Sequence, residues 1–287
     1  MRLKPGVTIE QAERDLCQAL ELFYNCRGGH ELHQYWLKYL HAVDLANPHL
    51  RQAFIEPDLA EGLYTRRYWH LLANGDDTRQ HLAVIREEVE LQLRAMEKAK
   101  EQLESLKSFA SRPGEILVFD TNMLLHWEPM TVVPWPQQVK ADEVRLIVPM
   151  VVIEELDRKK YADSSTAKAA VKAIRMIERL LRDTAPGSAV PVRDGTTLEV
   201  LLDEADHRRR PLSEADTEII ERAALLDQIT GSRSKLLTGD LHMKLMARTL
   251  GLSVFELDAK FKNQQQKKTL KDVQAEEAAA SAGTPAK

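Results

Sequence analysis

Apolar residues in the first 110 positions recur at intervals of three and four, the spacing of one face of a helix. The first such stripe consists of Ile9, Ala12, Leu16, Leu20 and Phe23. Thr8 and Gln11 stand at its start as a capping box. Further helical patterns follow at about 31–45 and 58–73, so this part of the chain is predicted to be all helical.

The longest helical pattern begins after the turn signal NGDD at 74–77 and continues to about residue 106. Its apolar residues stay on one face with charged residues between them, which indicates a long amphipathic helix or a short coiled-coil arm. The stretch SRPG at 111–114 ends the pattern, because proline disfavours a helix at the residue before it. We therefore predict a helical accessory domain over residues 1–110.

The pattern changes at residue 115, where short apolar runs begin to alternate with helical stretches. The runs are ILVF (116–119), VRLIV (144–148), TLEVLL (197–202), KLLT (235–238) and SVFEL (253–257). Helices are expected between them at about 150–160, 165–183, 214–228 and 241–250. This alternation predicts an α/β domain over 115–260, with a parallel sheet between helices. Residues 263–287 are polar and rich in alanine, and a disordered tail is expected there.

Composition narrows the possible partners and compartments. A formal net charge of -4 argues against coating nucleic acid through bulk charge, so any such contact needs a local basic patch. The two cysteines make no disulfide framework and fit a reducing cytoplasm. Cys26 with His30 and His33 lacks a fourth ligand at zinc spacing. No run of about 18 apolar residues occurs, so we expect a cytoplasmic protein without a membrane segment.

Acidic residues stand at comparable places along the α/β region. Asp120 follows the first apolar run, Glu154 and Glu155 open the helix after the second, and Asp216 and Asp240 stand at the starts of later helices. Each has an ordinary structural explanation. Asp is a favoured N-cap, and glutamates in a first turn suit the helix dipole.

The acids taken together are harder to explain by capping alone. In a parallel sheet, ligands sit beyond the carboxyl ends of the strands, and those ends would gather the acids into one place. Carboxylates that close raise one another's pKa unless a divalent cation neutralises them. Hard oxygen ligands favour Mg2+ or Mn2+, and such an ion can activate water and stabilise charge at a phosphodiester. The pattern therefore predicts phosphodiester hydrolysis.

Four segments, in this order, resemble the four motifs of PIN-domain nucleases: VFDTNMLL, VPMVVIEELDRKK, LSEADTEIIERAA and LLTGDLHMKLMA. The resemblance covers roughly residues 115–258. It implies a five-stranded parallel sheet flanked by helices and a metal-dependent endoribonuclease that uses Mg2+ or Mn2+ and leaves a 5′-phosphate and a 3′-hydroxyl. The motif acids, which would be both metal ligands and catalytic residues, are Asp120, Glu155, Asp216 and Asp240.

Supporting residues follow from the same resemblance. Asn122 matches the polar residue that helps to hold the site, and Thr238 matches a small hydroxyl residue near it. In the second motif the family's acid stands directly before an aliphatic residue, which selects Glu155 over Glu154. Neighbours on a helix point about 100° apart, so only one of the two should face the site. The number of metal ions, one or two, stays open.

Basic residues near the acids are candidates for binding RNA phosphates. They are Arg158, Lys159 and Lys160 after Glu155, Lys244 and Arg248 after Asp240, and Arg208, Arg209 and Arg210 before the third motif. A solvated helix face is the alternative for each cluster. His126 and Trp127, close behind Asp120, are candidates for stacking on a base of single-stranded RNA, with core or edge packing as the alternative for Trp127.

The helical region in front distinguishes the chain from small PIN toxins. The second motif of the chain, VPMVVIEELDRKK, resembles that of PIN domains joined to PhoH-type ATPases. Neither GxxxxGKS nor GxxxxGKT occurs, so no need for ATP is expected. The stretches at 24–36 and 64–70 mix aromatic and basic residues. Such stretches position RNA or, more commonly, form helix interfaces for self-association or a regulatory protein.

Three other functions compete with this interpretation. A haloacid-dehalogenase-type phosphotransferase needs a second Asp two positions after Asp120, where Asn122 stands. A receiver domain needs an acidic pair at the end of the first strand, and none is present there. A non-catalytic RNA- or protein-binding protein with a PIN-like fold is the main alternative. The sequence predicts a metal-dependent endoribonuclease, with its target RNA, its tolerance of DNA and its role in toxicity, RNA processing or defence left open.

Overall fold

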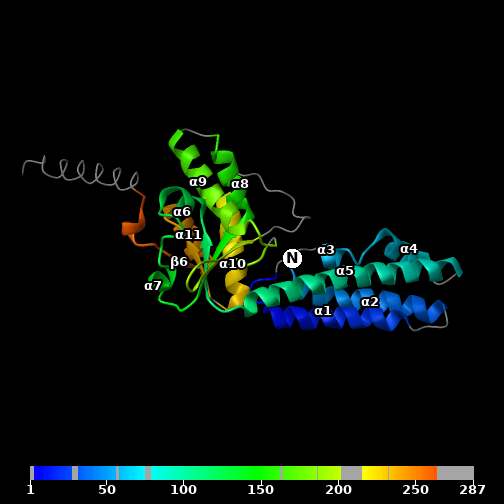
Figure 1. Ribbon diagram of the computed structural model, residues 1–287. Coiled ribbons are helices and arrows are strands. Elements are labelled where there is room, and N and C mark those ends of the chain that lie inside the picture. The colour runs from blue at the N-terminus through cyan, green and yellow to red at the C-terminus, as the bar shows by residue number, and fades with distance from the viewer. Residues whose placement is uncertain are drawn as a thin grey trace, which may run out of the picture. The chain divides into compact units, whose positions relative to one another are not determined.

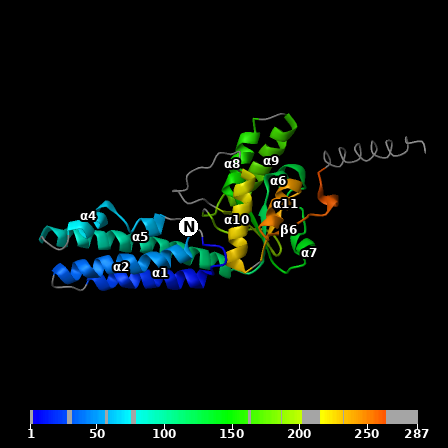
Figure 2. The same ribbon diagram turned by 180° about the vertical axis from the view of Figure 1, so that it is seen from behind.

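The computed structural model describes residues 3–27, 32–55, 58–74, 79–161, 164–185, 187–201, 215–231 and 233–263. It divides into two compact units, each shown in Figures 1 and 2. The helical unit comprises residues 1–112 with Gln228–Gly231, and the α/β unit comprises residues 113–227 and 232–287. The expected tail beyond residue 263 and the basic run Arg208, Arg209 and Arg210 lie outside the described residues.

The helical unit is built from three long helices, α1 (Ile9–Tyr24), α2 (Leu32–Ala53) and α5 (Arg79–Ser111). They lie side by side in both views (Figures 1 and 2). Shorter elements connect them: η1 (Asn25–Arg27), α3 (Asp58–Glu61) and α4 (Arg66–Asn74). The single helix expected at 58–73 is therefore two, because Thr65 Oγ1 accepts from the backbone N–H of Tyr68 and starts a new helix there.

The helix patterns read from the sequence face the core of this unit. Thr8 and Gln11 form the expected capping box, with Thr8 Oγ1 accepting from the Gln11 N–H and Gln11 Oε1 accepting from the Thr8 N–H, both at 3.2 Å. All five residues of the α1 stripe are buried, as are Ile85, Val89, Leu93 and Met96 of α5. Burial of these apolar stripes is the main favourable contribution to the stability of the bundle.

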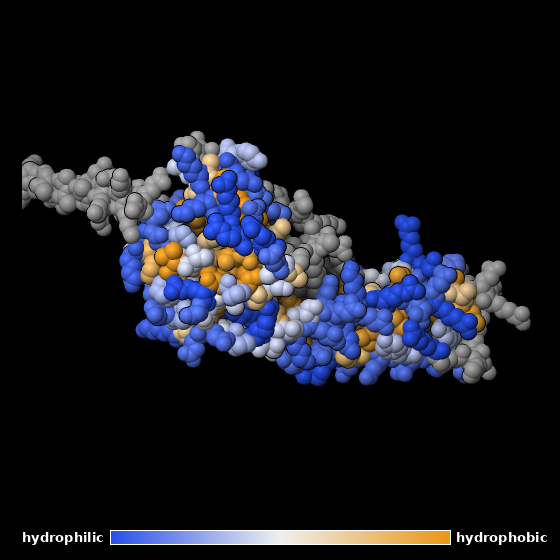
Figure 3. Space-filling view, viewed as in Figure 1, coloured by the Kyte–Doolittle hydropathy of each residue, from blue (hydrophilic) through white to orange (hydrophobic). Residues whose placement is uncertain are grey.

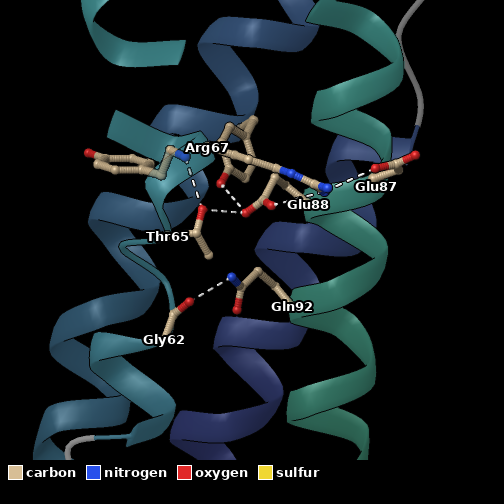
Figure 4. A network of polar contacts seen from close by, with 8 residues as sticks. Gly62, Thr65, Arg67, Glu87, Glu88 and Gln92 are labelled. Carbon is tan, nitrogen blue, oxygen red and sulfur yellow. Dashed lines mark hydrogen bonds and ion pairs between the residues drawn. The ribbon is translucent and has the colours of Figure 1, made fainter. Parts of the chain in front are cut away.

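A buried carboxylate, Glu88 of α5, connects three helices of this unit (Figure 4). The Thr65 hydroxyl donates to Glu88 Oε2 at 2.6 Å, and the Tyr39 hydroxyl donates to the same oxygen at 3.4 Å. The Arg67 guanidinium lies 3.6 Å from Glu88 Oε1 and 2.9 Å from Glu87 Oε2. These contacts provide the hydrogen bonds that a carboxylate needs when it is removed from water.

We expect Glu88→Gln to lower the free energy of unfolding of the helical unit by about 1–3 kcal/mol, because the amide oxygen accepts weaker hydrogen bonds than a carboxylate and the amide nitrogen cannot pair with Arg67. The matched control is Glu87→Gln, whose carboxylate is largely exposed and should matter by less than about 1 kcal/mol. Hydrogen exchange of α5 amides would measure both. Equal effects for the two variants would contradict the assignment.

The α/β unit contains a six-stranded sheet with the strand order β3-β4-β2-β1-β5-β6. Five of its strands are parallel and correspond to the five apolar runs of the sequence. Their bounds are β1 (Glu115–Phe119), β2 (Val144–Pro149), β4 (Thr196–Leu201), β5 (Ser234–Leu237) and β6 (Ser253–Phe255). The central strands β1 and β2 are almost completely buried, as expected for a parallel sheet covered on both faces.

The sixth strand, β3 (Val190–Arg193), pairs antiparallel with β4 and was not expected. It makes the sheet mixed, where five purely parallel strands were predicted. The strand is short, contains Pro191 and has no continuous apolar run. The signal for it was the dipeptide Asp194-Gly195 between the two strands, since Gly195 has φ +64°, the conformation that tight hairpins require.

Helices flank this sheet, with bounds α6 (Thr121–His126), α7 (Trp135–Val139), α8 (Met150–Lys159), α9 (Ser164–Leu181), α10 (Ala215–Thr230) and α11 (Leu241–Thr249), followed by the short η3 (Ala259–Phe261) (Figure 1). Because α8 begins at Met150, Glu154 and Glu155 lie in its second turn. The expectation that they open the helix and suit its dipole was therefore wrong. Within the described ranges, no helix is long and apolar enough to cross a membrane.

Candidate functional site

Asp120 follows the central strand β1 directly and caps the helix after it. Its backbone N–H donates to Leu237 O at 3.1 Å, which extends the β1–β5 pairing by one residue. Asp120 Oδ1 accepts from the Asn122 N–H at 3.2 Å, so the N-cap reading is confirmed. Phe119 is paired with Leu237, and Thr238, the residue directly after β5, donates its hydroxyl to Asp120 Oδ2 at 2.8 Å. The sheet register therefore places Thr238 beside Asp120.

The Asp120 carboxylate is buried, with only 1% of the residue exposed. Burial raises its pKa to about 6, and the charges of Asp216 and Glu155 add to this rise, while the hydrogen bonds from Thr238 and Asn122 oppose it. A carboxylate that only caps a helix at the protein surface does not need to be buried near other acids. The smaller contributions from Asp216 and Glu155 place Asp120 within reach of the charges of two other acids.

Glu155 is turned toward this group by two neighbours. The Thr121 hydroxyl donates to Glu155 Oε2, and Lys159 Nζ lies 3.0 Å from Glu155 Oε1. The Glu155 side chain is 15% exposed, whereas Glu154 is exposed on the surface. The geometry therefore brings Glu155, and not its neighbour, to the end of β1, as the aliphatic-neighbour argument predicted.

Asp216 and Asp240 lie on the solvent side of the same group. The pKa of Asp216 is raised by burial first and then by the charges of Glu155 and Asp240, while His242 and Lys159 lower it. Asp240 caps α11, because its Oδ1 accepts from the Met243 N–H at 3.0 Å. Its own N–H donates to Thr238 Oγ1 at 3.0 Å, so one hydroxyl holds two of the acids in place.

The donor set suits a hard divalent cation in charge and in atom type, since all four acids offer carboxylate oxygens. Asp216 makes no hydrogen bond to a described residue, and Asp240 Oδ2 receives none. Within the described ranges, however, no three His, Cys, Asp or Glu side chains are arranged closely enough to hold a metal ion. The acids are thus coupled electrostatically without forming a closed coordination shell.

Three of the cations predicted to contact RNA, Lys159, Lys160 and Lys244, are bound to acids of their own. Lys159 lies against Glu155, Lys160 Nζ is 2.7 Å from Asp157 Oδ1, and Lys244 Nζ is 2.9 Å from Glu256 Oε2. Arg158 is exposed on α8. Lys159 therefore faces the acid group, and Lys160 and Lys244 act first as partners of surface carboxylates.

Three residues near the acids were missed by the sequence reasoning. Thr121 donates to Glu155, the charge of His242 lowers the pKa of Asp216, and Gly239 lies beside the Trp127 indole. A Cβ atom on Gly239 would lie 3.6 Å from both Nε1 and Cζ2 of that ring. Thr121 lies inside the motif DTN, and Gly239 lies directly before Asp240. Their positions beside a motif acid were the sequence signal that could have identified them.

This fold and this group of acids define an α/β domain with an acidic site at the carboxyl ends of its central strands. The family model described as the PIN domain matches residues 117–258. These residues are a PIN domain, preceded by a helical N-terminal region, so the family resemblance and the fold class predicted from the motifs are confirmed. PIN domains are typically metal-dependent nucleases that act on nucleic acid.

Other comparisons add little to this assignment. A solved structure described as a domain of a functionally unknown protein from Methanocaldococcus jannaschii matches with 15% sequence identity and a TM-score of 0.34. The match covers 51% of this chain and 93% of that one. No curated protein matches the chain.

Proposed function

We propose that the chain is a metal-dependent endoribonuclease that hydrolyses RNA phosphodiester bonds. The observation that carries the proposal is the environment of Asp120. This carboxylate is buried, has a pKa raised to about 6 and is electrostatically coupled to Glu155 and Asp216 at the end of the central strand. Burying mutually repelling acids is unfavourable for folding, and a bound cation offsets that repulsion.

Asp120, Glu155, Asp216 and Asp240 are the residues that would hold Mg2+ or Mn2+. When bound, the metal would activate water and stabilise the negative charge that develops at the phosphorus. The chain's own groups orient the acids, and two of them oppose the rise in the pKa of Asp120. Thr238 and the Asn122 N–H stabilise the ionised form of Asp120, while Thr121 and Lys159 fix the Glu155 carboxylate.

The direct test is cleavage of a labelled single-stranded RNA by the full chain with Mn2+ or Mg2+. Cuts that disappear in EDTA and return with added metal would support the proposal. Metal binding has an independent measurement, because an ion that binds only the folded chain raises its melting temperature. Absence of both cleavage and a thermal shift across several RNAs would contradict it.

A second function is favoured by one observation, the contact of Lys159 with Glu155 at 3.0 Å. The ammonium group partly neutralises the acids without a metal, as expected for a non-catalytic protein that uses this fold to bind RNA or a protein. Tight RNA binding that is unchanged by EDTA, together with no cleavage in Mn2+, would favour this second function over the nuclease.

We expect Thr238→Val to reduce metal affinity and cleavage by about 10–100-fold, the usual effect of removing a group that orients a metal ligand. Valine keeps the shape of the side chain but removes the donor to Asp120 and leaves the Asp240 N–H without its acceptor. Thr238→Ser is the matched control, since it retains the hydroxyl. Titration of Mn2+ followed by melting temperature would compare them, and equal loss in both variants would contradict the role.

A further inference from the structure

A pocket of about 690 Å³ opens between the end of α6 and the helix α9. Its apolar lining includes Leu124 and Met176, and Trp127 forms part of its wall. Trp127 also approaches Gly239, the residue directly before Asp240. The pocket therefore adjoins the acids, and α6, which begins after Asp120 and ends at the pocket, spans only about 9 Å.

One edge of this pocket is a row of cations on α9, which we call the α9 ridge: Lys168, Lys172, Arg175 and Arg179. At about 100° per residue, these four positions fall within about 60° of one another on the helix. All four are exposed, and none forms an ion pair with any residue that the structure describes. Strongly hydrophilic side chains cover this part of the molecule in the space-filling view (Figure 3).

The charge around the pocket is one-sided. The only acid among its lining residues, as far as the structure describes them, is Glu128, against the four cations of the ridge. A fifth cation, Lys262, lies over the Trp127 ring at 5.4 Å. By contrast, Lys159, Lys160 and Lys244, the cations nearest in sequence to the acids, are already paired with carboxylates. The four cations of α9 are therefore the largest group of positive charge near the site that no described acid pairs, while Arg158 and Arg248 are exposed singly on α8 and α11.

We propose that the α9 ridge and its pocket bind the part of a single-stranded RNA that extends from the bond being cut, an inference that rests on the proposed function. From Lys168 to Arg179 the ridge is about 16 Å long, and each of its four cations can contact a phosphate of a strand that runs along the helix. The apolar pocket offers a place for a base beside them. A single strand presents phosphates along one side, which the ridge would bind, and planar bases along the other, one of which the pocket would hold.

The test is the salt dependence of binding to a labelled 20-nucleotide single-stranded RNA, measured on the full chain in EDTA so that the RNA stays intact. The ridge variant is Lys168→Gln, Lys172→Gln, Arg175→Gln and Arg179→Gln combined. Each phosphate contact contributes about 0.7 to the slope of log affinity against log salt for single strands. The variant should therefore lower the slope by about 2.8, which corresponds to roughly 10²- to 10³-fold weaker binding at 0.1 M salt.

A matched control removes the same charge from the helical unit: Lys4→Gln, Arg14→Gln, Arg86→Gln and Arg94→Gln. These four are exposed, and none pairs with an acid in the described part of the chain. The control should change the slope by less than 1. Equal loss in both variants would show a bulk charge effect, and an unchanged slope in the ridge variant would show that α9 does not bind RNA; either result overturns the inference.

Two further outcomes separate this inference from the proposed function. Cleavage by the parent chain, together with an unchanged slope in the ridge variant, would leave the nuclease standing and overturn the ridge. Loss of the slope without any cleavage in Mn2+ would support the ridge and contradict the nuclease. Polyglutamate at equal charge that displaces RNA as well as unlabelled RNA does would identify an acidic polypeptide as the partner and overturn the inference.

Discussion

Asp120→Asn should abolish RNA cleavage and at the same time make the PIN domain more stable at pH 7.5. The loss of activity should reach at least about 10²- to 10³-fold, because a metal ion contributes several kcal/mol to the transition state and its most buried ligand would be gone. The gain in stability follows from removing a buried charge among other acids. Loss of function together with a gain in stability is typical of catalytic residues.

The stability gain should depend on pH. In the folded chain the pKa of Asp120 is raised from 3.8 to about 6. The stabilising contribution of this carboxyl group is therefore fully present below about pH 4 and is lost as the pH rises through about 6. A shift of that size corresponds to about 3 kcal/mol at most, and the weaker hydrogen bonds of the amide reduce the expected gain to about 1–2 kcal/mol.

Chemical denaturation of the full chain at pH 5.0 and 7.5, followed by hydrogen exchange of the β1 amides, would measure this gain. It should be smaller at pH 5.0. The control is Asp258→Asn, which removes an N-cap carboxylate of η3 that is exposed and has a lowered pKa, so neither stabilisation nor loss of cleavage is expected. A variant of Asp120 that is less stable at pH 7.5, or that still cuts RNA in Mn2+, would refute the assignment.

Glu199→Ala should lower the free energy of unfolding of the PIN domain by about 3–5 kcal/mol, the usual effect of leaving one member of a buried ion pair alone. Arg145 of β2 and Glu199 of β4 are both almost fully buried inside the sheet. Their two hydrogen bonds, Nε to Oε1 at 2.9 Å and Nη2 to Oε2 at 3.2 Å, form a bidentate pair. Removing the carboxylate leaves the guanidinium charge without this partner in the interior.

Hydrogen exchange of the β2 and β4 amides would measure this loss. Replacing both members, as Arg145→Met with Glu199→Leu, should recover most of the stability, because the desolvation cost of both charges disappears together. The matched control is Lys235→Ala, which breaks the half-buried Lys235–Glu115 pair of the same sheet and should cost less than about 1 kcal/mol. Similar losses for Glu199→Ala and Lys235→Ala would contradict this reasoning.

The elements of this fold that depend on local patterns were predictable from sequence. The α1 stripe, the capping box of Thr8 and the five parallel strands are each encoded in periodicity and composition over a few residues. Elements that depend on a turn or on a tertiary contact were not. The strand β3 is formed by a hairpin around Gly195, and the division of the 58–73 helix depends on the side chain of Thr65.

The same distinction applies to the site. The position of each acid relative to a strand end was readable, because a parallel sheet aligns its carboxyl ends. Which cations remain available for RNA was readable only in part. The Lys160–Asp157 pair is a local i,i+3 contact, but the Lys244–Glu256 pair joins α11 to the residue after β6 and depends on the fold. The pairing of Arg145 with Glu199 likewise needs the adjacency of β2 and β4, although each is a lone charge within an apolar run.

Asp120 and Asp240 are helix caps and also candidate metal ligands. This combination affects how the chain could lose activity during evolution. Asparagine is as good an N-cap as aspartate, so an Asp-to-Asn replacement at either place keeps the helix start. Drift should therefore produce stable, correctly folded copies that no longer cut. Under the proposed function, such a copy would still compete for the same RNA and would act as a natural antagonist of its active parent.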